Sequence, residues 1–136
     1  MEGLGRVFNL ATSATTGKTR VNLQDATAIT FVLIGATSGN ATVREANAAS
    51  SGTEQDLAAV TRYYTQNNGV WTKVTQAAAA TVTAATGGLL AVTIHAAQLS
   101  AGFKYITITH ASGSFVYVLH DLTVQRKPVN LRAVTS

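Results

Sequence analysis

Few residues in this chain of 136 have the type and spacing that enzyme chemistry requires. The segment TTGKT at residues 15–19 resembles the end of a phosphate-binding P-loop, where backbone amides surround phosphate and the lysine reaches its outer oxygens. The first glycine of that motif would have to stand at position 12, which is Thr12, and no buried strand precedes it. We therefore interpret the segment as part of a polar arm.

The three histidines, His95, His110 and His120, fall at the ends of expected strands. Together with Asp121 they are of the right types to bind a metal or to transfer protons. Their spacing matches no short motif such as HxxxH, and His110 and His120 each end an apolar stripe of their own strand. We interpret them as polar residues at strand rims and expect no metal, cofactor or catalytic residue.

Hydrolase motifs are equally weak. A serine nucleophile would stand on a sharp turn such as GxSxG, and GATSGN at residues 35–40 is instead interpreted as a hairpin loop. A glycoside hydrolase needs a pair of carboxylates across its substrate. The chain has only six acids, and two of them, Glu54 and Asp56, lie together in an expected loop, so such a pair is not indicated. The sequence predicts a protein that is not an enzyme.

The formal net charge of +4 is concentrated at the two ends of the chain. Residues 1–24 hold three basic residues against one acid, and residues 122–136 hold three basic residues and no acid, whereas residues 25–121 are nearly neutral. The basic residues of the C-terminal segment form no long run and have no interleaved aromatic residues that could stack on bases. We therefore expect no specific binding of nucleic acid.

Three features indicate where the chain is made. Cysteine is absent, which excludes disulfides and thiolate chemistry. The longest apolar run, AITFVLIGA at residues 28–36, is far shorter than the roughly 20 residues that span a bilayer. The first ten residues lack the pattern of a secretory signal. These features favour a protein that stays in the cytoplasm where it is made and has no membrane partner.

The elements that would position all these residues are short β-strands separated by turns. Alternation of β-branched and aromatic residues predicts about nine strands, near residues 20–24, 28–34, 40–46, 57–65, 70–76, 80–84, 90–95, 103–109 and 114–120. The fold class expected is all-β, a single antiparallel β-sandwich or jelly-roll-like domain.

Turn residues refine this prediction. Asn68 and Gly69 predict one tight hairpin, and ASGS at residues 111–114 predicts another between the last two strands. The spacing in residues 57–65 would also permit a helix, but β-branched and aromatic residues favour a strand. One helical turn is expected at residues 96–99, ended by Gly102, and residues 47–56 are expected to form an exposed loop.

The alternation fails at both ends, which divides the chain into an N-terminal arm (1–19), a β-sandwich body (20–121) and a C-terminal arm (122–136). The arms hold apolar and basic residues that could bind a groove on a partner: Arg6, Phe8 and Leu10 at one end, and Arg126, Lys127, Pro128, Val129, Leu131 and Arg132 at the other. Proline cannot donate to a ladder and favours extended structure before it. The small residues at 76–88 indicate a thin edge strand or a contact surface against another subunit.

Four segments carry a resemblance to a known group of proteins: DATAITFVLIGA, AAVTRYYTQNNGVWTKVTQAAAATVTA, GFKYITITH and LHDLTVQRKPVNL. Their texture and order, from about Leu23 to Leu131, resemble small virion proteins encoded near the capsid genes of tailed bacteriophages, particularly those of actinobacteria. The resemblance includes no catalytic signature and no fixed binding motif.

The resemblance implies a head-associated structural protein, most plausibly a decoration or cement protein on the outside of an icosahedral shell. Its implied partners are the major capsid protein and copies of itself, with a trimer preferred over a dimer, and its implied location is the virion. The alternatives are a tail or surface module that binds host glycan through Trp71 or Tyr63, a tail-tube or connector part, and a small hydrolase.

Overall fold

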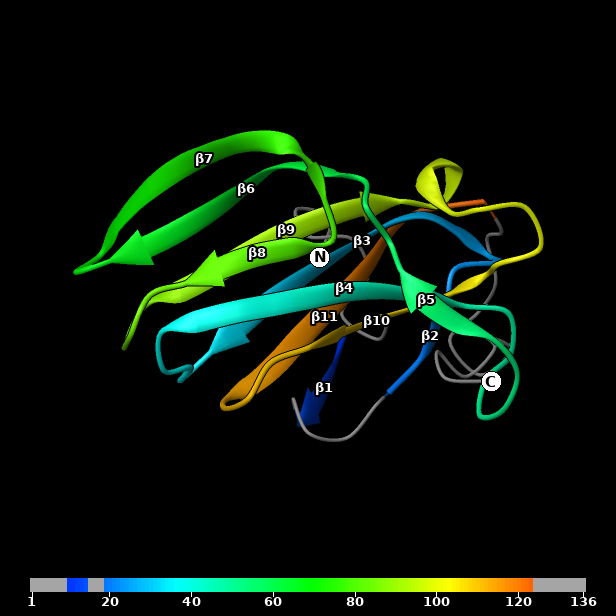
Figure 1. Ribbon diagram of the computed structural model, residues 1–136, viewed down its shortest axis with the longest axis horizontal. Helices are drawn as coiled ribbons and strands as arrows, with labels where there is room; N and C mark the ends of the chain where they lie inside the picture. The colour runs from blue at the N-terminus through cyan, green and yellow to red at the C-terminus, as the bar shows by residue number, and fades with distance from the viewer. Residues whose placement is uncertain (1–9, 15–18, 124–136) are drawn as a thin grey trace.

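Two antiparallel β-sheets pack face to face as a β-sandwich in the computed structural model, which describes residues 10–14 and 19–123 and, for residues 10–14, the backbone alone (Figure 1). The six-stranded sheet has the order β1 (Leu10–Ala14), β11 (Ser114–Leu122), β3 (Ala26–Ile34), β9 (Leu89–His95), β6 (Val60–Asn67) and β7 (Val70–Ala79). The fold class predicted from the sequence is confirmed.

The second sheet is built around β4. It contains β2 (Val21–Asn22), β10 (Tyr105–Thr109), β4 (Gly39–Ala46), β5 (Glu54–Asp56) and β8 (Thr81–Ala84). One edge of β4 pairs with β10. Along its other edge, residues 39–42 pair with β8 and residues 44–46 pair with β5.

The core forms because side chains in a strand point alternately to opposite faces of the sheet. On β3, Ile29, Phe31 and Leu33 point inward and are buried, whereas Thr30, Val32 and Ile34 on the other face are partly or largely exposed. The ring of Phe31 packs edge-on against Phe115 and tilted against Tyr117, with both pairs of ring centroids 6.1 Å apart. These aromatic rings join β3 and β11 at the centre of the six-stranded sheet.

Several local predictions hold. Of the strand expected at residues 57–65, residues 60–65 are extended as part of β6, whereas residues 57–59 form a turn before it, and a single 3-10 turn (η2) spans Ala96–Gln98. Asn68 and Gly69 have φ angles of 49° and 81°, as a two-residue hairpin requires, and Gly102 has a φ of 85°. Within the described residues, no helix is long and apolar enough to cross a membrane.

Two predicted hairpins are wrong. The turns at residues 35–38 and 110–113 join strands of different sheets, β3 to β4 and β10 to β11. The two crossings lie side by side, since the amide of Thr37 donates to the hydroxyl of Ser112 at 2.9 Å. A turn sequence shows that the chain changes direction, but pairing across the core decides which sheet the next strand joins.

Two further segments differ from the sequence analysis. The expected loop at residues 47–56 ends in β5, a short strand held by ion pairs that alternation does not reveal. Residues Leu10–Ala14 lie within the expected N-terminal arm, yet their backbone forms β1 and pairs with Ser114–Val118 of β11. The body of the protein therefore includes part of the segment assigned to the arm.

Replacement of Gly113 by alanine should destabilise the fold more than replacement of Gly69. Both have positive φ angles, 85° and 81°, so alanine costs about 1–2 kcal/mol at each through the backbone alone. A Cβ atom on Gly113 would lie 2.5 Å from the carbonyl oxygen of Ile34, whereas one on Gly69 would meet nothing within 4 Å. Urea unfolding should show the larger loss for Gly113→Ala, and equal losses would contradict this close approach.

The burial of Tyr117 should make the fold less stable in alkali. Desolvation by burial raises the pKa of this hydroxyl above its ordinary value of 10.0. The unfolded chain therefore loses the proton first, so the contribution of neutral Tyr117 is complete below pH 10 and is lost above it, by at most about 1.4 kcal/mol per pH unit. Tyr117→Phe should reduce the decline in the free energy of unfolding measured above pH 10. A decline identical to that of the unaltered protein would refute this assignment.

Candidate functional site

The outer face of the six-stranded sheet is the most conspicuous exposed surface of the described residues. It is formed by the side chains that alternate with the core residues, and we call it the outer sheet face. Three large side chains on it are unusually open: Trp71 is 47% exposed, Ile34 44% and Tyr64 41%. Smaller, partly buried apolar residues lie on the same face: Val32 on β3, Ala91 on β9, and Val116 and Val118 on β11.

The strand register brings the two exposed aromatic residues together. Tyr64 of β6 lies opposite Lys73 of β7, and Gln66 lies opposite Trp71. Tyr64 and Trp71 are therefore diagonal neighbours on the same face, at the roughly 7–8 Å spacing over which long side chains interact. The exposed aromatic residue expected from the sequence was Trp71 or Tyr63. Tyr63 instead points into the core, where it is 5% exposed and its hydroxyl accepts a hydrogen bond from the amide of Thr83 at 3.3 Å.

A groove opens beside Tyr64 because β6 and β9 pair only at residues 64–66 and 89–91 and then diverge. Gln98 lies at its end, accepting a hydrogen bond from the His95 amide at 2.8 Å and donating one to the Ala59 carbonyl at 3.1 Å. The groove has a volume of about 460 Å³ and is lined by Ala59, Val60, Thr61, Arg62, Tyr64, Thr93, His95 and Gln98. A guanidinium group, a phenol and an imidazole thus surround it, which is chemistry suited to a polar or anionic ligand.

A chain of hydrogen bonds crosses the outer sheet face from β11 to β9. Asp121 contacts Nδ1 of His120 at 3.0 Å, Nε2 of His120 contacts the Thr30 hydroxyl at 2.9 Å, and that hydroxyl contacts Thr93 at 2.8 Å. The order of carboxylate, imidazole and hydroxyl is that of a hydrolytic triad. Hydrolysis also needs N–H groups aimed at the reacting oxygen, and the backbone at Thr30 is paired with Val118 and Thr93 on its two sides. We assign this chain to holding β3, β9 and β11 together.

The histidines considered at the sequence level lie in separate surroundings. His95 is exposed at the rim of the groove. His110 is 7% exposed, and its Nδ1 accepts a hydrogen bond from the Ser112 amide at 3.1 Å. In the described part of the chain, no three histidine, aspartate or glutamate side chains gather where they could hold a metal ion.

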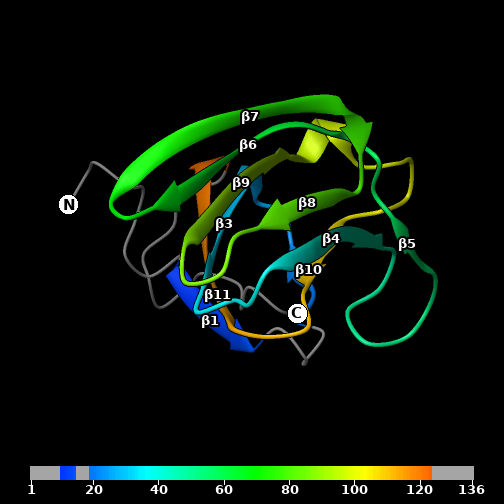
Figure 2. The same ribbon diagram turned by 60° about the vertical axis from the view of Figure 1, so that its left-hand side comes forward.

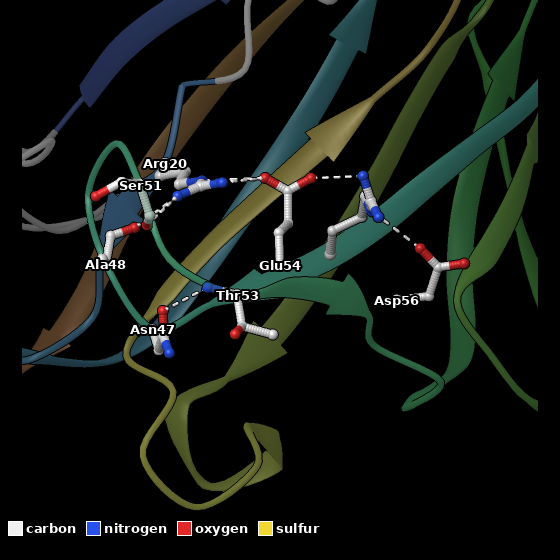
Figure 3. A network of polar contacts seen from close by, with 8 residues as sticks. Arg20, Asn47, Ala48, Ser51, Thr53, Glu54 and Asp56 are labelled. Carbon is white, nitrogen blue, oxygen red and sulfur yellow. Dashed lines mark hydrogen bonds and ion pairs between the residues drawn. The ribbon is translucent and has the colours of Figure 1, made fainter.

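An ion-pair network on the second sheet was missed by the sequence analysis (Figure 3). Glu54 lies between two arginines, with Arg20 at 2.7 Å from one carboxylate oxygen and Arg44 at 2.5 Å from the other. Arg44 also contacts Asp56 at 2.9 Å. Arg20 donates further hydrogen bonds to the carbonyls of Ala48 and Ser51, which fix the loop before β5. The acids Glu54 and Asp56 at alternate positions could have indicated one charged strand face. No rule based on neighbouring residues, however, pairs Glu54 with Arg20.

Glu45 is a buried carboxylate that the sequence analysis did not select. It lies on the core-facing side of β4, 1% exposed. One of its oxygens accepts a hydrogen bond from the Gln55 amide group at 2.6 Å and the other accepts one from the Ser100 backbone at 2.8 Å. Its position joins β4 to β5 and to the turn that follows η2, which is a structural role.

Most of the partner-binding residues predicted from the sequence lie outside the described residues. These are Arg6, Phe8, Arg126, Lys127, Pro128, Val129, Leu131 and Arg132, and residues 15–18 of the P-loop-like segment lie outside them as well. Leu10 is the exception, since its backbone begins β1 and pairs with Val118. The binding role of the two terminal segments therefore stays a prediction.

Loss of the Glu54 charge should destabilise the protein far more than loss of the Asp56 charge. The Glu54 side chain is 7% exposed and its partner Arg20 10%, so Glu54→Gln leaves a nearly buried guanidinium without its counter-charge, at a cost of about 3 kcal/mol. The Asp56 side chain is 62% exposed, and Asp56→Asn should cost less than about 1 kcal/mol. Chemical unfolding of both variants measures the difference. Similar losses in the two would show that Glu54 does not organise the network.

Comparison with known proteins returned no relative: no family model, no curated protein and no solved structure matches the chain.

Proposed function

We propose that the protein is a structural component of a tailed-bacteriophage particle, a decoration protein that binds the outside of the icosahedral head and acts by binding and not by catalysis. The resemblance of four sequence segments to small phage virion proteins supports this proposal. The observation that carries it is the outer sheet face, which exposes Ile34, Tyr64 and Trp71 among smaller apolar residues.

The outer sheet face has the composition of a protein-binding surface. Apolar patches of this kind on a β-sandwich mark interaction sites more often than scattered single residues do. Tryptophan, tyrosine and arginine contribute most of the binding energy at interfaces when they are enclosed by a partner. Trp71 and Tyr64 are diagonal neighbours, and Arg62 precedes Tyr64 by two positions on the same strand.

Charge favours an acidic partner surface. The charged residues of β6 and β7 are Arg62 and Lys73, both of which are exposed. The terminal segments are basic as well, with three basic residues and no acid in residues 122–136. Complementary charge speeds association and aligns two surfaces. In the proposed complex, the major capsid protein supplies the acidic groups.

The proposed mechanism is mechanical. The sheet face provides the main contact, and the apolar and basic residues of the two terminal segments add contacts to neighbouring capsid subunits. Repeated contacts around a closed assembly raise the effective concentration of each one, so that weak interfaces hold as a set. The protein would thus stabilise junctions between shell subunits.

A second candidate is a module that binds host glycan. The observation that favours it is the position of Tyr64 beside the groove that also contains Arg62, His95 and Gln98. An exposed aromatic ring next to hydrogen-bonding side chains suits a sugar. The spread of apolar side chains over the outer sheet face, from Val116 and Val118 on β11 to Trp71 on β7, favours the larger protein partner.

Binding to heads should depend on both the sheet face and the C-terminal segment. In phage particles, mass spectrometry should find the protein in simple lattice proportion to the major capsid protein. Purified protein added to heads that lack it should bind, and Trp71→Ala should weaken this binding at least tenfold, because a tryptophan enclosed by a partner contributes about 2 kcal/mol or more. Removal of residues 124–136 should abolish binding and leave the sandwich folded, because β11 ends at Leu122.

Thr81→Ala provides the control for this experiment, since Thr81 is an exposed residue of the other sheet. It should bind heads as the unaltered protein does. Full binding by both the Trp71 variant and the truncated chain would refute the proposal. A few copies per particle together with binding to purified host glycan would instead favour the second candidate.

A further inference from the structure

Among the residues that the structure describes, strand β7 forms one edge of the six-stranded sheet, and its paired residues, 70–75 and 79, pair with β6 alone. None of the ten residues of β7 is buried, and the hairpin of β6 and β7 extends beyond the rest of the sandwich, where Figure 1 and Figure 2 both show β7 along the rim of the molecule. The exposed residues include Val70, which is 66% exposed on the core-facing side, and Trp71 on the outer side. Within the described residues, the strand is therefore open along its outer edge and at Val70 and Trp71, whereas Val74 packs partly against the core.

Open edges of this length are normally protected, because their free N–H and C=O groups pair with other chains. The usual protection is a proline, a bulge or several charged side chains along the strand. Residues 70–75 contain no proline and one charge, Lys73, and they pair regularly with residues 62–67. The irregularity in the pairing comes later, between Thr75 and Ala79. The first half of β7 is thus a regular edge with free backbone groups.

The turn decides which of these groups point outward. A two-residue turn at Asn68 and Gly69 makes Asn67 and Val70 a hydrogen-bonded pair. Bonding alternates along the strand from there, so Val70, Thr72 and Val74 direct their backbone groups to β6. Trp71, Lys73 and Thr75 direct theirs away from the sheet.

We infer that β7 pairs with β7 of a second copy of this chain, antiparallel and about a twofold axis at Thr72, so that the two six-stranded sheets form one continuous sheet. In this register Trp71 of each copy lies opposite Lys73 of the other on the outer sheet face. Val70 lies opposite Val74 on the other side. The outward-pointing backbone groups of Trp71 and Lys73 then bond to each other across the axis.

Side-chain chemistry selects this register over its neighbours. An ammonium group and an indole ring attract each other. Pairing Val70 with Val74 covers the side chain of Val70, which is 66% exposed in the single chain. A twofold axis at Lys73 would place two like charges directly opposite each other, which is destabilising. An axis at Val74 would place Thr72 opposite Gln76, whose side chain is already bonded to the carbonyls of Val60 and Thr81.

This inference goes beyond the proposed function and does not depend on it, because self-association is measured on the purified protein without phage heads. Light scattering at increasing concentration should give a mass of twice the 14.1 kDa of one chain. Lys73→Pro should raise the dissociation constant of the pair at least tenfold, since proline removes an outward N–H and is tolerated at a sheet edge. The melting temperature and circular dichroism of this variant show whether its sandwich is intact.

Single cysteines test the register, and the chain is suited to them because it contains none of its own. In the inferred pair of copies, the two residues at position 72 lie opposite each other and their backbones do not hydrogen-bond to each other. The Cα atoms of such a pair are about 4.5 Å apart, so the two thiols of Thr72→Cys lie within the range of a disulfide. Mild oxidation should link this variant into covalent dimers. Lys73→Cys and Val74→Cys are the matched controls, and their thiols should link much less.

Each other outcome overturns the inference. Efficient linkage of Lys73→Cys or Val74→Cys in place of Thr72→Cys would show a different register. A monomer at all concentrations, or a trimer whose mass is unaffected by Lys73→Pro, would show that this edge is not the contact between copies.

Discussion

The strict alternation of side chains along the central strands is the constraint on which the rest of the structure depends. Ile29, Phe31 and Leu33 fill the core from β3, and the rings of Phe115 and Tyr117 meet Phe31 from β11. Once these residues face inward, the intervening residues of the same strands have to face outward. The set of side chains on the outer sheet face, apolar and polar, is thus fixed by the same packing that stabilises the fold.

The two sheets differ in the edge strands β5 and β7. The second sheet ends at β5, a strand of three residues held by Glu54 and Asp56 to arginines from β4 and from the segment before β2. Charge and short length protect that edge from pairing with other chains. The six-stranded sheet ends at β7, which is long, weakly charged and open. This asymmetry directs association to one side of the molecule.

The outer sheet face and the β7 edge are continuous, since Trp71 and Lys73 belong to both. Pairing of two copies at β7 would double the apolar face and bring two clusters of Tyr64, Trp71 and Arg62 onto one surface. If each cluster binds the partner weakly, the two linked clusters would bind it more tightly than either does alone. Two sheet faces joined in this way also suit a partner that presents identical binding sites at regular spacing, as a shell of identical subunits does.

The sequence by itself determined the all-β class, most strand positions and the Asn68–Gly69 hairpin, because alternation and turn chemistry act over a few residues. It did not determine that β3 and β4, or β10 and β11, belong to different sheets, because pairing partners are chosen by core packing between distant residues. The same reason explains the choice of Tyr63 over Tyr64 as the exposed ring, since a shift of one position reverses the face. The bonds of Glu54 to Arg20 and of Glu45 to Ser100 span 34 and 55 residues. Contacts of that range exist only once the sandwich has formed, so the tertiary structure alone decided them.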